Sequence, residues 1–190
     1  MIKKILFFLL LVMNVRTATF AMTVDDVFYD QHFSLDGQSL SLNGVGLRKI
    51  FFVKVYAAGL YLPQTTQSTS FVQEQKGPKR MRLVLRRDVD AADFVEALKD
   101  GLQDNSSERQ RKSLEKEIST LVTVMEKIGD VKENDRVDFD YSEKQGVRVL
   151  LNNRMIGEKI GGQDLYNAVL RIWIGEKSID DNLKKSLLNL

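Results

Sequence analysis

The chain has 190 residues, of which 43% are hydrophobic and 28% are charged, and its formal net charge is +2. These values are typical of a globular protein and suit a single domain. The sequence contains no Cys and only one His, His32. It therefore excludes disulfides, zinc fingers, iron–sulfur clusters, thiol nucleophiles and multi-histidine metal sites.

The first 21 residues have the pattern of a secretory signal peptide. Two lysines precede an apolar run over residues 5–13, which is too short to span a bilayer, and small residues stand at the −3 and −1 positions of a cut after Ala21. We predict a cleavable signal peptide over 1–21, followed by one domain over 22–190 in the periplasm or outside the cell. An uncleaved membrane anchor is the alternative.

Removing this segment changes the charge of the protein. The segment carries three basic residues and no acid, so the charge of residues 22–190 falls to −1. This charge gives no indication of nucleic-acid binding. No later apolar run approaches 18 residues, so we predict no transmembrane segment in the mature chain.

The first part of the mature chain is rich in strand signals. Residues 22–29 suggest an extended lead-in, and Asp36-Gly37 between two short runs predicts a hairpin. Residues 43–46 (Asn-Gly-Val-Gly) predict a turn or bulge that separates this hairpin from the next element. The run 49–62 (KIFFVKVYAAGLYL) predicts one long central strand that is apolar on both faces, with Gly59 at a bulge or a close backbone approach.

The remaining elements alternate between strands and helices. Residues 80–87 predict a strand with one apolar and one polar face. Apolar residues at three- and four-residue steps predict helices, and alternation between tight turns predicts a three-strand meander. The predicted helices cover 90–99, 105–128, 164–174 and 179–188, and the meander strands cover 136–141, 147–152 and 154–160. This segregation of strands and helices predicts an α+β fold with an antiparallel sheet.

Several side chains are candidates for a binding site. Arg48 stays charged at any relevant pH, so it must be solvated, paired with an acid or turned toward a cavity, where it would suit a carboxylate or enolate oxygen. Tyr56 and Tyr61 lie on opposite faces of the predicted strand, and either would equally suit core packing. Strand alternation predicts that Lys54 shares a face with Tyr56. Lys54 would then lie either at the solvent end of the sheet or inside a pocket.

Two other patterns have ordinary structural interpretations. Gly44-x-Gly46 lacks the third glycine of a dinucleotide fingerprint and precedes a strand, which argues against nucleotide binding. Asp138 and Asp140 alternate with apolar residues, so strand alternation explains them better than paired-carboxylate chemistry. We predict no cofactor and no metal.

The block Gly44-Val-Gly-Leu-Arg48, followed by the run from Lys54 to Leu62, resembles the chalcone isomerase-like family, especially its exported bacterial branch. The segments 85–89, 101–105 and 170–175 agree with it. The resemblance implies an open-faced β-sandwich, in which helices wrap a large curved antiparallel sheet and a cleft between them holds the ligand. It places Arg48 in that cleft, where the plant enzymes stabilise an oxa-Michael ring closure and the fatty-acid-binding branch holds a carboxylate.

The sequence departs from the enzymes of that family in its polar groups. Tyr56 stands where the plant enzymes have a Thr, and the segment 88–102 lacks the Tyr and Asn that they use. Losing each preorganised donor costs about 10²–10³ in rate. We therefore expect a non-catalytic, exported binding protein for a small amphipathic acid such as a fatty acid, held by Arg48 with Tyr56, Lys54 and Tyr61 nearby.

Two alternatives from other classes stay open. The first is an isomerase, an intramolecular lyase that performs the ring closure with the same arginine. The second is a structural or partner-binding envelope protein that uses the charged helix face over Glu108–Glu117. Its protein partners are not indicated by the sequence, because interleaved acids and bases are also typical of a solvated helix face.

Overall fold

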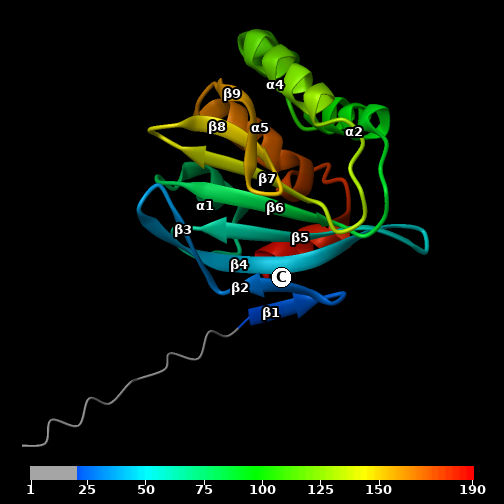
Figure 1. The fold of residues 1–190 in the computed structure, drawn as a ribbon. Helices are drawn as coiled ribbons and strands as arrows, with labels where there is room; N and C mark the ends of the chain where they lie inside the picture. The colour runs from blue at the N-terminus through cyan, green and yellow to red at the C-terminus, as the bar shows by residue number, and fades with distance from the viewer. Residues whose placement is uncertain (1–20) are drawn as a thin grey trace, which may run out of the picture.

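The computed structural model describes residues 21–190, so the predicted signal peptide lies, except for Ala21, outside the described residues. Seven strands form one antiparallel sheet in the order β3-β4-β5-β6-β7-β8-β9, which is also their order along the chain (Figure 1). A separate hairpin is formed by β1 and β2. The strands are β1 (Ala21–Val24), β2 (Val27–Asp30), β3 (His32–Leu35), β4 (Gln38–Ile50), β5 (Val53–Leu62), β6 (Lys79–Leu85), β7 (Arg136–Ser142), β8 (Gly146–Leu151) and β9 (Arg154–Ile160).

Helices cover one face of the seven-stranded sheet. They are α1 (Thr69–Glu74), α2 (Ala91–Asp104), α3 (Glu108–Ser113), α4 (Glu115–Ile128), α5 (Gln163–Ile174) and α6 (Asp181–Leu188). α5 packs on β7 and β8, α6 packs on β4 and β5, and α2 lies against α4 and α5. The main hydrophobic core lies between these helices and the sheet. The predicted α+β class, with a large antiparallel sheet packed against helices, is confirmed.

A second, smaller core lies on the opposite face of the sheet. Tyr29 of the β1–β2 hairpin packs there with Leu40 of β4 and with Ala57 and Tyr61 of β5. A Cβ atom on Gly59 would lie 2.6 Å from the Tyr29 ring, so the close backbone approach predicted at Gly59 is confirmed. Since Ala58 and Leu60 of β5 belong to the main core, this strand is apolar on both faces, as its sequence predicts.

The run 49–62 is two strands joined by a turn, so the prediction of one long strand is wrong. β4 ends at Ile50, β5 starts at Val53, and Phe51 between them has a φ of 54°. At residues 43–46 the predicted bulge is present as a shift of register between Leu42 and Gly44, but it does not separate two elements, because β4 continues through it. Apolar content alone does not distinguish a turn made of phenylalanines from a strand.

The polar face of β6 is buried, which its alternating sequence did not indicate. Arg80 and Arg82 stand directly opposite Asp140 and Asp138 of β7, and all four residues are at most 9% exposed. The period of two is correct, but the polar side chains face a covered surface and pair with one another. The predicted helix over 105–128 is likewise two helices, because α3 ends and α4 begins at Leu114.

Candidate functional site

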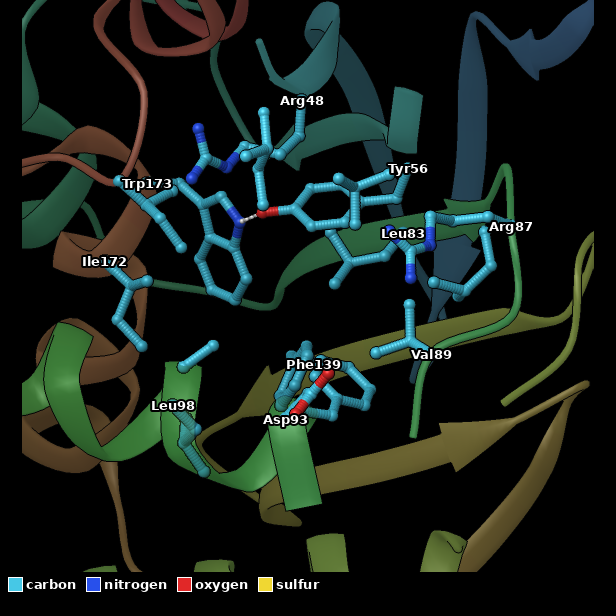
Figure 2. A pocket seen from close by; sticks show the side chains of 16 residues that line it. Arg48, Tyr56, Leu83, Arg87, Val89, Asp93, Leu98, Phe139, Ile172 and Trp173 are labelled. Carbon is cyan, nitrogen blue, oxygen red and sulfur yellow. Dashed lines mark hydrogen bonds between the residues drawn. The ribbon is translucent and has the colours of Figure 1, made fainter. Parts of the chain in front are cut away.

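A cavity of about 180 Å³ lies between the helix-covered face of the sheet and helices α2 and α5. Its walls are mostly apolar, and they come from β6, β7, α2 and α5. The principal wall residues are Leu83, Leu85, Phe94, Leu98, Phe139 and Ile172. Figure 2 shows Arg48, Tyr56 and Trp173 together on one side of this cavity, across from Leu98 and Phe139.

Arg48 reaches the cavity from β4, close to the point where β4 and β5 change register. Its side chain is 18% exposed, and its Nη1 donates both to the Asp180 carboxylate, at 3.2 Å, and to the Lys49 carbonyl, at 3.1 Å. Within the described residues, Nε and Nη2 donate no hydrogen bond. The guanidinium therefore keeps three N–H donors for a guest while one nitrogen anchors it.

Asp180 is shared between this arginine and a helix. It is the N-cap residue of α6, and its side chain accepts hydrogen bonds from the backbone N–H groups of Asn182 and Leu183. Burial opposes ionisation of the Asp180 carboxyl, but hydrogen bonds from Leu183, Arg48 and Lys49 outweigh it and hold its pKa below the usual range. Because this one carboxylate also satisfies the helix end, it offsets the charge of Arg48 only in part.

Tyr56 stands opposite Arg48 on β5 and supplies a second polar atom. Its hydroxyl oxygen accepts a hydrogen bond of 3.0 Å from Nε1 of Trp173 in α5. Burial raises the pKa of Tyr56 to about 12, so the phenol is neutral near pH 7. The hydroxyl proton makes no hydrogen bond within the described residues, which leaves it able to donate to an acceptor in the cavity.

Lys54 lies apart from this cavity. The register moves from Arg48↔Tyr56 to Lys49↔Lys54, so Val55 is an extra residue that breaks the alternation of β5. Val55 and Tyr56 both line the cavity, whereas Lys54 bonds to Asp25 of the β1–β2 turn. The expectation that Lys54 and Tyr56 share a face fails for this reason.

Tyr61 also lies apart from the cavity, in the second core on the other face of the sheet. Its ring is 6.0 Å from that of Phe33, and Arg82 lies over its face. Of the four candidate residues, the structure brings Arg48 and Tyr56 together and separates Lys54 and Tyr61 from them.

Three cavity residues that carry polar groups were not among the site candidates from the sequence. Trp173 belongs to the apolar stripe of its helix, and nothing in that pattern shows that its indole would bond to Tyr56. Arg87 and Asp93, both exposed, bring a further cation and an anion to the cavity lining. Arg87 is the second residue after the buried strand β6, and no pattern in the sequence marks it as part of a cavity.

Over residues 21–190, His, Asp and Glu side chains form no cluster that could hold a metal ion. None of the helices described is both long enough and apolar enough to cross a bilayer.

Comparison with known proteins finds a matching family and a solved structure of similar fold. The sequence model of a family described as chalcone isomerase-like matches residues 21–189. The crystal structure of a fatty-acid binding protein of Arabidopsis thaliana is similar in fold, with a TM-score of 0.67 and 16% sequence identity over 89% of this chain and 96% of that chain. A search of curated proteins finds no match.

Proposed function

Because the chain belongs to the chalcone isomerase-like family, we propose that it binds a small amphipathic acid, such as a fatty acid, without converting it. The observation that carries this proposal is the position of Arg48, a permanent cation with unused donors at the wall of an apolar cavity. A carboxylate at Nη2 and Nε would also lie within reach of the neutral Tyr56 hydroxyl. A fatty-acid binding protein with the same fold supports this ligand class.

The size of the cavity limits what it can enclose. Its volume of about 180 Å³ is below the roughly 300 Å³ at which drug-sized pockets begin and near the roughly 150 Å³ of a cavity that holds benzene. A short acyl chain or one ring fits inside. A longer chain would extend beyond the cavity, and one place for this is Ile50, which lines the cavity and is 48% exposed.

Non-catalytic binding accounts for the polar groups better than ring closure does. The Trp173 N–H is already donated to Tyr56, so the donors left at the cavity are those of Arg48 and the Tyr56 hydroxyl, which suit a single carboxylate. An isomerase needs several preorganised donors aimed at the developing charge. We expect the conversion of chalcone, followed by the loss of its long-wavelength absorbance, to proceed at the uncatalysed rate; acceleration by the wild-type protein that Arg48→Ala abolishes would favour the isomerase.

The third function class, an envelope protein that acts through the helix face over Glu108–Glu117, has less support. The charged side chains of α3 are largely exposed, and Lys112 pairs with Glu108 one turn away. Such a pair is typical of a solvated helix surface. A stable protein partner captured from the native compartment and lost on substitution of Glu108 would favour this class.

We further propose that the protein acts after export, in the periplasm or outside the cell. The pattern of residues 1–21 supports this proposal: two lysines, a short apolar run and small residues before the cut. Cell fractionation combined with N-terminal sequencing tests it. The expected mature chain starts at Met22, and a full-length protein retained in the cytoplasm contradicts the proposal.

The binding proposal is tested by titrating fatty acids of increasing chain length into the purified protein by calorimetry. Arg48→Ala should weaken binding by about tenfold or more, because hydrogen bonds to charged groups contribute about 1.5–3 kcal/mol. Tyr56→Phe should weaken it by several-fold, since one neutral donor is lost. Arg154→Ala, an exposed arginine on β9, is the matched control. Equal affinities for wild type and Arg48→Ala, with both folded by circular dichroism, contradict the proposal.

A further inference from the structure

The turn between β4 and β5 carries an unusual exposed apolar patch, which we call the β4–β5 tip (Ile50–Val53). All four residues are apolar, and their exposed fractions are 48, 92, 99 and 47% along the chain. The turn projects beyond the neighbouring ribbon (Figure 1). Side chains this apolar are favoured in a turn only where something other than water covers them.

The backbone of the tip makes phenylalanine a costly choice. Phe51 has a φ of 54°, in the left-handed region that Gly or Asn adopts readily and bulky residues avoid. Core packing does not explain the residue either, because its side chain is 92% exposed. Neither the turn geometry nor the stability of the fold accounts for two adjacent phenylalanines here, and an intermolecular contact does.

Two lysines stand directly behind the tip. Lys49 and Lys54 are cross-strand partners, and both are exposed. Like charges directly opposite each other destabilise a strand pair. Lys54 bonds to Asp25, whereas Lys49 forms no ion pair within residues 21–190. An apolar end followed by the free charge of Lys49, beside the acid-paired Lys54, is complementary to a surface with negative charge outside and hydrocarbon beneath.

The spacing of these groups fits the interface of a bilayer. Two to three residues separate the lysines from the end of the turn, which at about 3.3 Å per residue is roughly 7–10 Å. Amphipathic elements bury their apolar side about 5–10 Å into the headgroup and acyl boundary. Phenylalanines at the tip would reach the acyl chains while the lysines stay among the headgroups.

The tip is also continuous with the cavity. Ile50 and Val55, on either side of the turn, line the cavity wall, and Arg48 lies two residues further back. Any molecule leaving the cavity past Ile50 therefore meets the β4–β5 tip first. An apolar ligand could pass between bilayer and cavity at this edge without crossing water.

We propose that the β4–β5 tip inserts into anionic phospholipid bilayers, with Phe51 and Phe52 among the acyl chains and Lys49 and Lys54 at the headgroups. The insertion holds the cavity edge at the membrane surface. Exchange of ligand at this surface rests on the binding function proposed above, but insertion itself does not.

Co-sedimentation with vesicles tests the insertion. The wild-type mature protein should sediment with vesicles that contain phosphatidylglycerol and less with vesicles of phosphatidylcholine alone. Phe51→Gly combined with Phe52→Ser should weaken binding by at least about tenfold, because each phenylalanine loses its burial. Lys49→Gln should weaken binding to the anionic vesicles by about fivefold and leave binding to neutral vesicles unchanged.

The controls separate insertion from damage to the fold. Gly suits the positive φ at position 51, so the double variant should keep or raise the unfolding midpoint. Phe71→Ser, a 40% exposed phenylalanine on α1, is the matched control and should sediment like wild type. Equal sedimentation of wild type and the double variant overturns the proposal. So does a tip-dependent dimer in solution without vesicle binding, which would assign the tip to a second copy of the chain.

Ligand binding in solution distinguishes this proposal from the proposed function. The double variant should bind a short-chain fatty acid with wild-type affinity in the absence of vesicles, because neither phenylalanine lines the cavity. Arg48→Ala should show the opposite behaviour. It should sediment with vesicles like wild type, but its affinity for the fatty acid should fall. If the protein binds vesicles but has no affinity for fatty acids, the insertion proposal stands and the proposed ligand is contradicted.

Discussion

Arg82 and Asp138 show how one pair of residues serves the packing of the sheet. The two face each other across β6 and β7, and the guanidinium donates two parallel hydrogen bonds of 2.8 and 2.9 Å to the carboxylate. Arg80 and Asp140 repeat the arrangement two residues along, with bonds of 2.5 and 2.6 Å. The ring of Phe33 lies 3.8 Å from the guanidinium of Arg80 and helps to cover the pairs.

Removing one member of such a pair should lower the free energy of unfolding more than removing both members. Arg82→Met leaves the buried Asp138 charge without its main partner and should lower the free energy of unfolding by about 3–5 kcal/mol. The double variant Arg82→Met with Asp138→Leu should recover part of that loss, since the two buried charges leave together and Arg80 keeps Asp140, although Arg136 loses its contact with Asp138. Urea unfolding of the four members of this cycle measures both values. Additive losses would show that the pair is not coupled.

At the scale of elements, the packing of α6 on β4 depends on two glycines. A Cβ atom on Gly44 would lie 2.2 Å from the Ser186 carbonyl oxygen, and one on Gly46 would lie 2.8 Å from the Leu183 side chain. Asn43 then donates to the Leu187 carbonyl at 2.7 Å and holds the end of the helix. The Gly-x-Gly pattern therefore serves a close contact between helix and strand, where the sequence suggested a turn or bulge.

Gly44→Ala should separate α6 from the sheet. The contact is with backbone that cannot move aside, so we expect a loss of more than about 2 kcal/mol in the free energy of unfolding. Because α6 begins at the cap Asp180, the same variant should also weaken acid binding at Arg48. Gly162→Ala is the control, since a Cβ there meets no atom within 4 Å. Equal stabilities of the two variants in urea would contradict this account of the glycine.

At the scale of the whole molecule, the sheet separates two cores that have different tasks. The hairpin side holds the buried ion pairs and the ring of Tyr61, whereas the helix side holds the cavity between β6, β7, α2 and α5. The apolar cavity described above lies on the helix side. The proposed binding function would thus use one face of the sheet, while the other face packs the buried ion pairs.

Filling the cavity should raise the stability of the fold and lower the affinity for the ligand. Ala97 lines the cavity from α2, and Ala97→Leu should raise the free energy of unfolding by about 1–2 kcal/mol through added apolar burial. The same variant should lose most of its affinity for fatty acids, because the volume they need is occupied. Thermal unfolding and calorimetry check the two effects. Unchanged affinity in a stable variant would place the binding site elsewhere.

The sequence by itself determined much of the local structure and the family. Period-two and helical spacing predicted the α+β class, the hairpin at Asp36-Gly37, the final meander and the last two helices. The block from Gly44 to Arg48 with its following strand identified the chalcone isomerase-like family, which the match over residues 21–189 confirms. These features are local, since each depends on residues a few positions apart.

Only the tertiary structure decided which side chains meet. The extra residue Val55 turned Lys54 away from Tyr56, Phe33 of β3 covered the polar face of β6, and α5 brought Trp173 to the Tyr56 hydroxyl. Phe51 and Phe52 became an exposed tip because the chain reverses there. Each outcome depends on contacts between segments far apart in sequence, and a local pattern carries no information on what covers a given face.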